Sequence, residues 1–292
     1  MEYIWLQEKV ILKDRYKIEK ELSVSDLSIV YLADDMLCNC RCIVKEYYPK
    51  GKVLRDMDGK TVVYRMPTYK QVFEDEVEIF LNEGEILKEC NHKNIVKYVD
   101  GFKENDTGYI VLEFCEGKTL DKHMKDENEV SIKEVLKDLF LPLIDAVEHI
   151  HKKGVIHRDI KPANIIINKD KGPVLIDFGS AINYKKDKNS KIFFTTGFSP
   201  VEFYSKEAKK GKFSDIYSVA ATFYYYLTGI TPQKSPDRLA GDCVEDLGSL
   251  NEEVSKFYSK IIMKNLSIDH RKRFSNVKLL KLFTYFEYLK HK

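Results

Sequence analysis

Hydrophobic residues follow two different spacings along this chain, and the change comes near Gly117. Before Gly117, short runs of β-branched and aromatic residues predict β-strands, because such residues pack well on a pleated surface. One longer segment, 69–90, repeats its apolar residues at helical spacing and predicts a helix among these strands. The predicted strands are 29–33, 42–46, 95–99 and 109–114.

After Gly117 the apolar spacing predicts mainly helices. Two strand-like runs, 165–168 and 174–176, interrupt this helical part as a hairpin. A strand-rich part followed by a helix-rich part predicts an α+β fold of two lobes, with a ligand-binding cleft expected between them. The predicted helices are 132–152, 214–228, 252–264 and 277–290.

The composition bears on which partners the protein binds and on the compartment in which it is expected. The 292 residues carry 48 Lys and Arg against 46 Asp and Glu, a net charge of +2. Nucleic-acid binders and polybasic membrane binders concentrate positive charge, so neither partner is expected. No segment reads as a signal peptide or a membrane span, which predicts a soluble, cytoplasmic protein with reduced cysteines. Cys38, Cys40 and Cys42 alternate and are expected to be structural thiols on one strand face.

Two short motifs carry the chemistry. The segment HRDIKPAN occupies 157–164, and Asp177-Phe178-Gly179 follows it after a predicted hairpin. Together they supply a carboxylate base, a neighbouring lysine, and an amide and a second carboxylate able to hold Mg²⁺ through oxygen. Phosphoryl transfer needs this set of groups, because the enzyme positions the reactants and neutralises the charge of the transferred phosphate.

With these motifs the chain resembles the eukaryotic-type protein kinase family over residues 16–286. The resemblance implies that Asp159 is the catalytic base and that Lys161 is the lysine typical of Ser/Thr rather than Tyr kinases. It also implies that Lys45 contacts the α- and β-phosphates of ATP and that Glu83 pairs with Lys45. The implied metal ligands, for Mg²⁺ or Mn²⁺, are Asn164 and Asp177.

The likeness is stronger to bacterial members of the family, on KEYYP at 45–49 and LIDFGSA at 175–181. The whole chain, 1–292, is expected to be a single kinase domain standing almost alone. Lys45 and Glu83 lie farther apart than in compact members, which predicts an inserted hairpin at 50–68 with Asp58-Gly59 as its turn. The expected parts are an N-lobe at about 16–114, a hinge at 113–117 and a C-lobe at about 118–286.

The resemblance also implies a nucleotide site. Leu22, Val30 and Ile166 would sandwich adenine, and Glu113 and Cys115 would contact it from the hinge. The glycine-rich loop departs from the family, because Ser23, Ser25 and Ser28 stand at its three glycine positions. Ile43 stands where the family usually has a small alanine.

An activation segment is expected between Gly179 and Glu202. Arg158 implies the capture of a phosphate on this segment. The candidate acceptors are Ser190, Thr195 and Thr196, of which Thr196 is expected to line the substrate groove and Thr195 to be the phosphorylation site. Three further family landmarks are Glu202, Asp215 and Arg273, and Glu202 and Arg273 are expected to form a buried ion pair.

The sequence therefore predicts an ATP-dependent Ser/Thr kinase that acts on a protein substrate and on its own activation segment. Any regulator is expected to act in trans or through segment 50–68. Two alternatives stay open. The loop serines and Ile43 are compatible with a nucleotide-binding pseudokinase that acts as a scaffold. A small-molecule kinase has the same fold, although Thr196, Glu202 and Asp215 belong to the peptide-binding framework.

Overall fold

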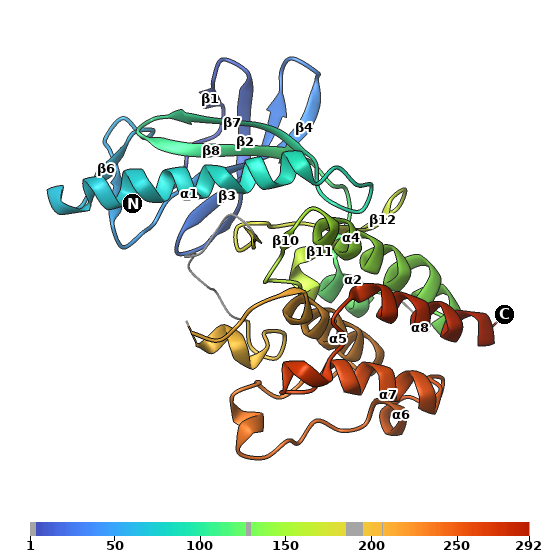
Figure 1. Cartoon of the computed structure of the whole chain (residues 1–292). Coiled ribbons are helices and arrows are strands. Elements are labelled where there is room, and N and C mark those ends of the chain that lie inside the picture. Colours follow the sequence, from blue (N-terminus) through green and yellow to red (C-terminus); the bar gives the residue numbers. More distant parts are fainter. Residues whose placement is uncertain (1–3, 127–129, 185–194, 206, 292) are drawn as a thin grey trace. The chain divides into compact units, whose positions relative to one another are not determined.

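The computed structural model describes residues 4–126, 130–184, 195–205 and 207–291. The chain divides into two units (Figure 1). We call Met1–Asn91 with Val96–Phe114 the sheet unit, and His92–Ile95 with Cys115–Lys292 the helical unit. The fold is that of the predicted α+β class, with an antiparallel sheet and one long helix in the first unit and mostly helices in the second.

The sheet unit is built on six antiparallel strands in the order β1-β2-β3-β4-β8-β7. Helix α1 lies along this sheet (Figure 1). All four predicted strands and the predicted helix are present with shifted ends. The strands are β1 (Ile11–Leu12), β2 (Tyr16–Val24), β3 (Ser28–Asp35), β4 (Cys40–Tyr47), β7 (Tyr98–Glu104) and β8 (Thr107–Glu113), and α1 is Lys70–Glu89.

The predicted hairpin between β4 and α1 is formed by β5 (Val53–Arg55) and β6 (Val62–Tyr64). Its turn contains Asp58 and Gly59, as expected. Gly59 has a φ of +71°, a conformation that favours glycine. Asp58 accepts hydrogen bonds from the backbone N–H groups of Lys60 and Thr61, which closes the turn.

The largest shift of a predicted strand is at β7, which begins at Tyr98 rather than at residue 95 and ends at Glu104 rather than at residue 99. The buried amide of Asn94 donates to the carbonyls of Lys171 and Pro173, and Ile95 pairs with Leu175. These partners belong to the helical unit, so residues 92–95 are part of that unit. The spacing of apolar residues cannot show that one end of a predicted strand pairs in a different unit from the other end.

Helices dominate the second unit, as predicted, but segment 132–152 is not one uniform helix. It contains α3 (Ile132–Glu134), a π-helix (Val135–Phe140) and α4 (Leu141–Lys152). The other helices are α2 (Leu120–Asp126), α5 (Lys212–Thr228), α6 (Leu247–Leu250), α7 (Lys256–Asn265) and α8 (Val277–Lys290). The short strands are β9 (Lys118–Thr119), β10 (Val155–Ile156), β11 (Ile165–Asn168), β12 (Gly172–Leu175) and β13 (Ile182–Asn183).

Local capping explains where several of these helices begin and end. The Ser131 hydroxyl and the Glu134 side chain form a reciprocal capping box at the start of α3. Ser255 accepts a hydrogen bond from the backbone of Tyr258, so α7 begins at residue 256 rather than at the predicted 252. Helix α5 ends at Gly229, whose φ of +72° is left-handed.

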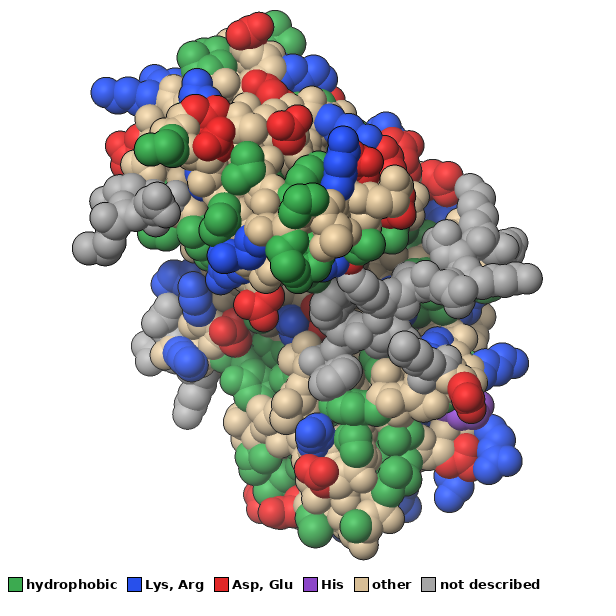
Figure 2. Space-filling view, turned by 90° about the vertical axis from the view of Figure 1, so that its left-hand side faces the viewer, with side chains coloured by type: hydrophobic (Ala, Val, Ile, Leu, Met, Phe, Trp, Pro, Cys, Tyr) green, Lys and Arg blue, Asp and Glu red, His purple; other side chains and the backbone are tan. Residues whose placement is uncertain are grey.

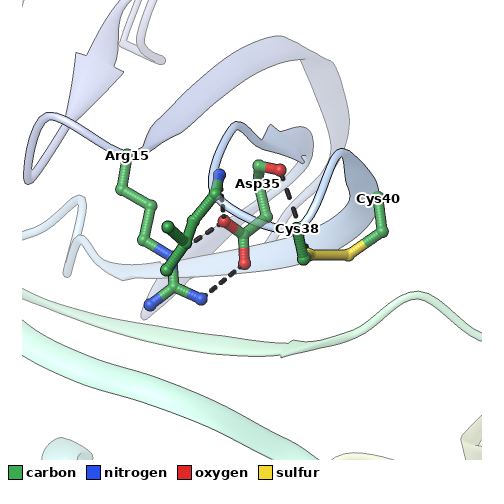
Figure 3. Close-up of a disulfide and its surroundings, with 5 residues drawn as sticks. Arg15, Asp35, Cys38 and Cys40 are labelled. Carbon is green, nitrogen blue, oxygen red and sulfur yellow. Dashed lines mark hydrogen bonds and ion pairs between the residues drawn. A yellow bond between two sulfur atoms is a disulfide. The ribbon is translucent and has the colours of Figure 1, made fainter.

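The cysteine prediction is wrong for two of the three alternating residues. Cys38 and Cys40 form a disulfide at the turn between β3 and β4 (Figure 3). Of the three, Cys42 alone is a buried thiol. The turn brings the two Cα atoms to 5.4 Å, within the usual range for a disulfide. Asp35 lies beside them and binds Arg15 through both carboxylate oxygens, at 2.8 and 2.7 Å. Alternation predicted one shared strand face, but Cys38 lies before the strand begins.

On the face drawn in Figure 2, acidic and basic side chains are interspersed rather than gathered into areas of one sign. This agrees with the near balance of 48 positive and 46 negative residues. Within the described ranges, no helix is both long enough and apolar enough to cross a membrane.

Candidate active site

The sheet unit contributes an ion pair between Lys45 of β4 and Glu83 of α1. The Lys45 ammonium donates to both carboxylate oxygens of Glu83, at 3.1 and 2.9 Å. Both side chains are largely shielded from solvent. Gly84 follows Glu83, and a Cβ at this position would collide with the ring of Tyr98 in β7. A glycine here therefore allows α1 to approach the sheet closely enough for the pair to form.

Residues expected around adenine lie on the same face of the sheet as Lys45. Val30 lies opposite Lys45 across the β3–β4 ladder, and Ile43 lies opposite Leu112 across the β4–β8 ladder. Since residues two apart on a strand share a face, Ile43 and Lys45 point the same way. Leu22, at the end of β2, is exposed, as is the neighbouring Ser23.

The loop expected to cover the phosphates is a tight turn closed by its own serines. Ser25 Oγ accepts hydrogen bonds from the backbone N–H of Leu27, at 3.3 Å, and of Ser28, at 3.0 Å. The carbonyls of Asp26 and Leu27 in turn accept from the backbone N–H groups of Lys50 and Tyr48. Where glycine would leave the backbone flexible, the serines give a loop that is held by side-chain and backbone hydrogen bonds.

The remaining expected residues of the nucleotide site are divided between the units. Glu113, at the end of β8, accepts a hydrogen bond from the backbone N–H of Lys97 at 3.0 Å. Cys115 is buried and belongs to the helical unit. Ile166 also belongs to that unit, where it pairs with Thr119 of β9 and Val174 of β12.

In the helical unit, three polar side chains donate hydrogen bonds to the Asp159 carboxylate. Lys161 Nζ donates to Asp159 Oδ2 at 2.8 Å, and Asn164 Nδ2 donates to the same oxygen at 2.9 Å. The hydroxyl of Thr195 donates to Asp159 Oδ1 at 2.9 Å and accepts from Lys161 Nζ at 3.0 Å. A threonine hydroxyl therefore lies between the expected base and the expected lysine.

Asp215 of α5 binds the backbone of the loop that carries Asp159. This carboxylate is fully buried and accepts from the backbone N–H groups of His157 and Arg158, both at 2.9 Å. His151 Nε2 lies 2.8 Å from the same carboxylate. Burial raises the pKa of Asp215, but the hydrogen bond from His151 and the neighbouring charges outweigh it and leave the pKa lowered.

These hydrogen bonds hold a strained backbone. Arg158 has a φ of +68°, which is uncommon for a residue with a Cβ. Its guanidinium donates to the carbonyl of Ser180. His157 is fully buried and packs edge-on against Phe178, with ring centroids 4.6 Å apart. The imidazole thus has a packing position in the core.

Asn164 and Asp177 offer ligand atoms suited to a hard cation. Within the part of the chain that is described, the Asn164 side chain forms two hydrogen bonds, and in both its nitrogen donates to an oxygen of Asp159. Its amide oxygen is therefore the atom available to a metal. Asp177 has a φ of +60° and accepts from the Gly179 backbone. Amide and carboxylate oxygens are the donors that Mg²⁺ prefers, so this pair fits the expected ion.

Of the two adjacent threonines of the activation segment, Thr195 lies beside Asp159. Thr196 was expected to line the substrate groove, but it is Thr195 that contacts Asp159 and Lys161. Thr196 is exposed. Spacing alone could not separate two adjacent threonines, because the turn after them decides which one faces the base. Ser190, the third candidate acceptor, lies outside the described residues.

The expected pair between Glu202 and Arg273 is present. Arg273 donates through both terminal nitrogens to the Glu202 carboxylate, at 2.7 and 3.1 Å. Both side chains are buried, and Ser214 of α5 donates to Glu202 at 2.8 Å. This pair connects the end of the activation segment to the segment before α8.

Sequence reasoning missed several residues that hold these groups in place. His151 contacts Asp215 from α4, and no local motif indicates it. Glu46, next to Lys45, is fully buried and binds Arg55 of the β5–β6 hairpin. Glu76 of α1 binds Lys52. All three are charged or titratable residues with distant partners, so only the folded chain brings each pair together.

Comparisons with known proteins agree with this geometry. A profile of the protein kinase domain matches residues 50–285. The chain is 30% identical to the serine/threonine-protein kinase PknA of Nostoc sp. over 282 residues, covering 92% of this chain and 46% of PknA. It is 31% identical to the serine/threonine-protein kinase B of Synechocystis sp. over 254 residues, covering 80% and 40% of the two chains.

The fold is similar to a solved structure described as the apo form of PpkA-294. The TM-score is 0.80 at 24% identity, over 97% of this chain and 99% of that one. The chain spans less than half the length of the PknA and kinase B sequences. The family profile begins at residue 50, after Lys45 and the serine-containing loop. On the profile match and these relatives, the chain belongs to the serine/threonine protein kinase family.

Proposed function

We propose that this chain transfers the γ-phosphoryl group of ATP to Ser or Thr hydroxyls of proteins, its own activation segment included. One observation carries the proposal. A threonine hydroxyl lies 2.9 Å from the Asp159 carboxylate and 3.0 Å from the Lys161 ammonium. The surroundings of Asp159 thus accept an aliphatic hydroxyl at hydrogen-bonding distance from a base, which is the geometry that a phosphate acceptor needs.

Each group then has a role in the transfer. Asp159 orients the acceptor hydroxyl and takes its proton, while Lys161 stabilises the negative charge of the transferred phosphoryl group. Lys45, held by Glu83, binds the α- and β-phosphates of ATP. Asn164 and Asp177 would hold Mg²⁺, which neutralises phosphate charge when bound. Asp215 keeps the loop of Asp159 in its strained conformation through two backbone hydrogen bonds.

The test is the intact mass of the protein after incubation with Mg²⁺ and ATP, with a generic basic protein added as acceptor. We expect gains of one or more phosphates on either protein. Asp159→Asn should slow the transfer about 10²- to 10⁴-fold, the usual contribution of a general base. Asp138→Asn, at an exposed carboxylate of the same unit, is the matched control and should leave the rate unchanged. Transfer that persists in Asp159→Asn would contradict the assigned role.

One observation favours a second candidate, a pseudokinase that binds nucleotide without transferring phosphate. Two backbone N–H groups at the tip of the loop, those of Leu27 and Ser28, already donate to Ser25. Glycine-rich loops cover the phosphates of ATP closely, and a loop with its donors engaged has fewer to offer. A rise in melting temperature with ATP but no phosphate on either protein would support this candidate over the kinase.

A further inference from the structure

The inserted hairpin binds to helix α1 next to the residues that position Glu83. Lys52, directly before β5, donates to the Glu76 carboxylate at 2.6 Å. The hydroxyl of Tyr47, at the end of β4, donates to the same oxygen at 2.8 Å. Tyr64 of β6 packs edge-on against Phe73 of α1, with ring centroids 5.4 Å apart. In Figure 1 the hairpin accordingly lies at the end of α1 where the helix begins.

The same hairpin is attached to the opposite face of β4. Arg55 donates through two nitrogens to Glu46, both at 2.7 Å, and the arginine is 4% exposed and the glutamate 0%. The hydroxyls of Tyr31 and Tyr109 also donate to Glu46, at 2.6 and 3.0 Å. Since Lys45 and Glu46 are adjacent on a strand, their side chains leave opposite faces of the sheet. The hairpin is thus bound on both sides of the strand that carries Lys45.

A continuous series of contacts connects the hairpin to the Lys45–Glu83 pair. Glu76 and Glu83 are seven residues apart in α1, about two turns, and therefore share one side of the helix. Between them, Phe80 packs against the Tyr47 ring with centroids 5.4 Å apart. The Lys45 ammonium lies 5.9 Å from the centroid of the same Phe80 ring. Displacing Glu76 would therefore disturb the residues around Lys45 as well.

We propose that segment 50–68 is a clamp that holds α1 in the position where Glu83 pairs with Lys45, and that Lys52 and Glu76 are its positioning residues. We call the contacts of Lys52, Tyr47 and Glu76, with those of Arg55 and Glu46, the hairpin clamp. The chain itself thus supplies the contacts that hold α1. The catalytic consequence rests on the proposed kinase function, whereas the structural consequence does not.

The test compares four variants of the full chain. Lys52→Met removes the ammonium, Tyr47→Phe removes the second donor but keeps the ring, and Lys52→Arg restores a cation. Lys103→Met is the matched control, because Lys103 also pairs with a carboxylate of α1, Glu78, at an exposed position where the two side chains are 55% and 65% exposed. Hydrogen exchange of backbone amides at 80–87 reports directly on how well α1 is held.

We expect Lys52→Met and Tyr47→Phe to speed this exchange about tenfold, since each removes one hydrogen bond to a shielded carboxylate. Affinity for ATP should fall about tenfold while affinity for adenosine stays the same, because Lys45 contacts phosphates and not the base. The kcat should fall with the ATP affinity. Lys52→Arg should restore all three quantities, and Lys103→Met should change none. A general loss of folding would lower both affinities together.

Unchanged exchange at 80–87 in both Lys52→Met and Tyr47→Phe would overturn the clamp, and so would an equal loss of ATP and adenosine affinity. A wild-type protein that transfers no phosphate would instead contradict the proposed function. The exchange measurement still decides the clamp in that case, because it requires neither nucleotide nor turnover. If Lys52→Met does not fold, Tyr47→Phe decides alone, since it removes a single oxygen atom.

Discussion

Each unit of this protein contains a fully buried carboxylate, and the two are held by different partners. Glu46 in the sheet unit binds the buried guanidinium of Arg55 and the hydroxyls of Tyr31 and Tyr109. Asp215 in the helical unit mainly binds backbone N–H groups of the loop that carries Asp159. Both residues are 0% exposed, so burial alone does not distinguish them.

The difference shows what each carboxylate can hold. Side-chain partners bring separate segments of the chain together, and Glu46 fastens the β5–β6 hairpin to the central strand β4. Backbone partners fix the conformation of one loop, and Asp215 stabilises the positive φ of Arg158 next to Asp159, the proposed base. A buried charge whose partner is a cation is also costly to break, because the cation remains buried. The following predictions test this contrast.

The largest effect on stability is expected from Glu46→Gln. It leaves the Arg55 guanidinium, which is 4% exposed, without a counter-charge, and such a loss costs about 3–5 kcal/mol. Urea unfolding of the full chain measures it. Adding Arg55→Met to Glu46→Gln should recover part of the loss, because the buried charge is then gone as well. A cost below about 1 kcal/mol, as for an exposed pair, would contradict the buried ion pair.

Asp215→Asn should cost less, about 1–3 kcal/mol in the free energy of unfolding, because asparagine still accepts one backbone hydrogen bond and no arginine or lysine is left buried without its counter-charge. The same urea titration measures it, with Asp138→Asn as the exposed control. Phosphoryl transfer should nevertheless fall strongly, since the loop of Asp159 loses its support. A cost larger than that of Glu46→Gln would reverse the comparison between the two carboxylates.

Acid should weaken the helical unit before the surroundings of Glu46. Burial lowers the pKa of His157, whereas the unfolded chain has the ordinary value near 6.5. Below pH 6.5 the unfolded chain therefore binds a proton that the folded chain does not. Stability is full above this value and falls as the pH drops, by about 1 kcal/mol between pH 7 and 5.5. Burial raises the pKa of Tyr31 and Tyr109, so neither changes charge in this range.

Urea unfolding at pH 7 and at pH 5.5 measures this dependence. His157→Phe removes one titrating group and should reduce the difference between the two pH values, while His92 and His149, whose pKa values burial also lowers, keep part of it. His270→Phe, at a residue that is not buried, is the matched control and should keep the wild-type pH dependence. An unchanged slope in His157→Phe would show that another group binds the proton.

The smallest effect is expected at the serine-containing loop. Ser25→Ala removes hydrogen bonds that are exposed to solvent, and water can replace the lost partner at Leu27 and Ser28. The free energy of unfolding should fall by about 0.5 kcal/mol or less. Urea unfolding measures it against the wild type. A loss comparable to that of Asp215→Asn would mean that the loop is held as firmly as a buried site.

The fold and most of the candidate site were predictable because they depend on residue types at set positions. Apolar spacing predicted α1 and α8 almost to the residue, and the helix ends follow from local caps such as Ser255. The motif at 157–164 predicted Lys161 and Asn164, which both bind the Asp159 carboxylate. Such signals are local, so they survive without knowledge of the partners.

Other features could not be predicted from the sequence. They depend on contacts between separate segments or on the local backbone conformation. The partners Lys52 and Glu76 are 24 residues apart, and Arg55 reaches Glu46 across a turn, with no repeat or motif to indicate either pair. Thr195 rather than Thr196 faces Asp159, since the backbone of the segment orients one of two identical neighbours. The Cys38–Cys40 disulfide requires a turn that strand alternation does not predict. Residue type and spacing thus specify which groups are available, and the three-dimensional packing specifies which of them meet.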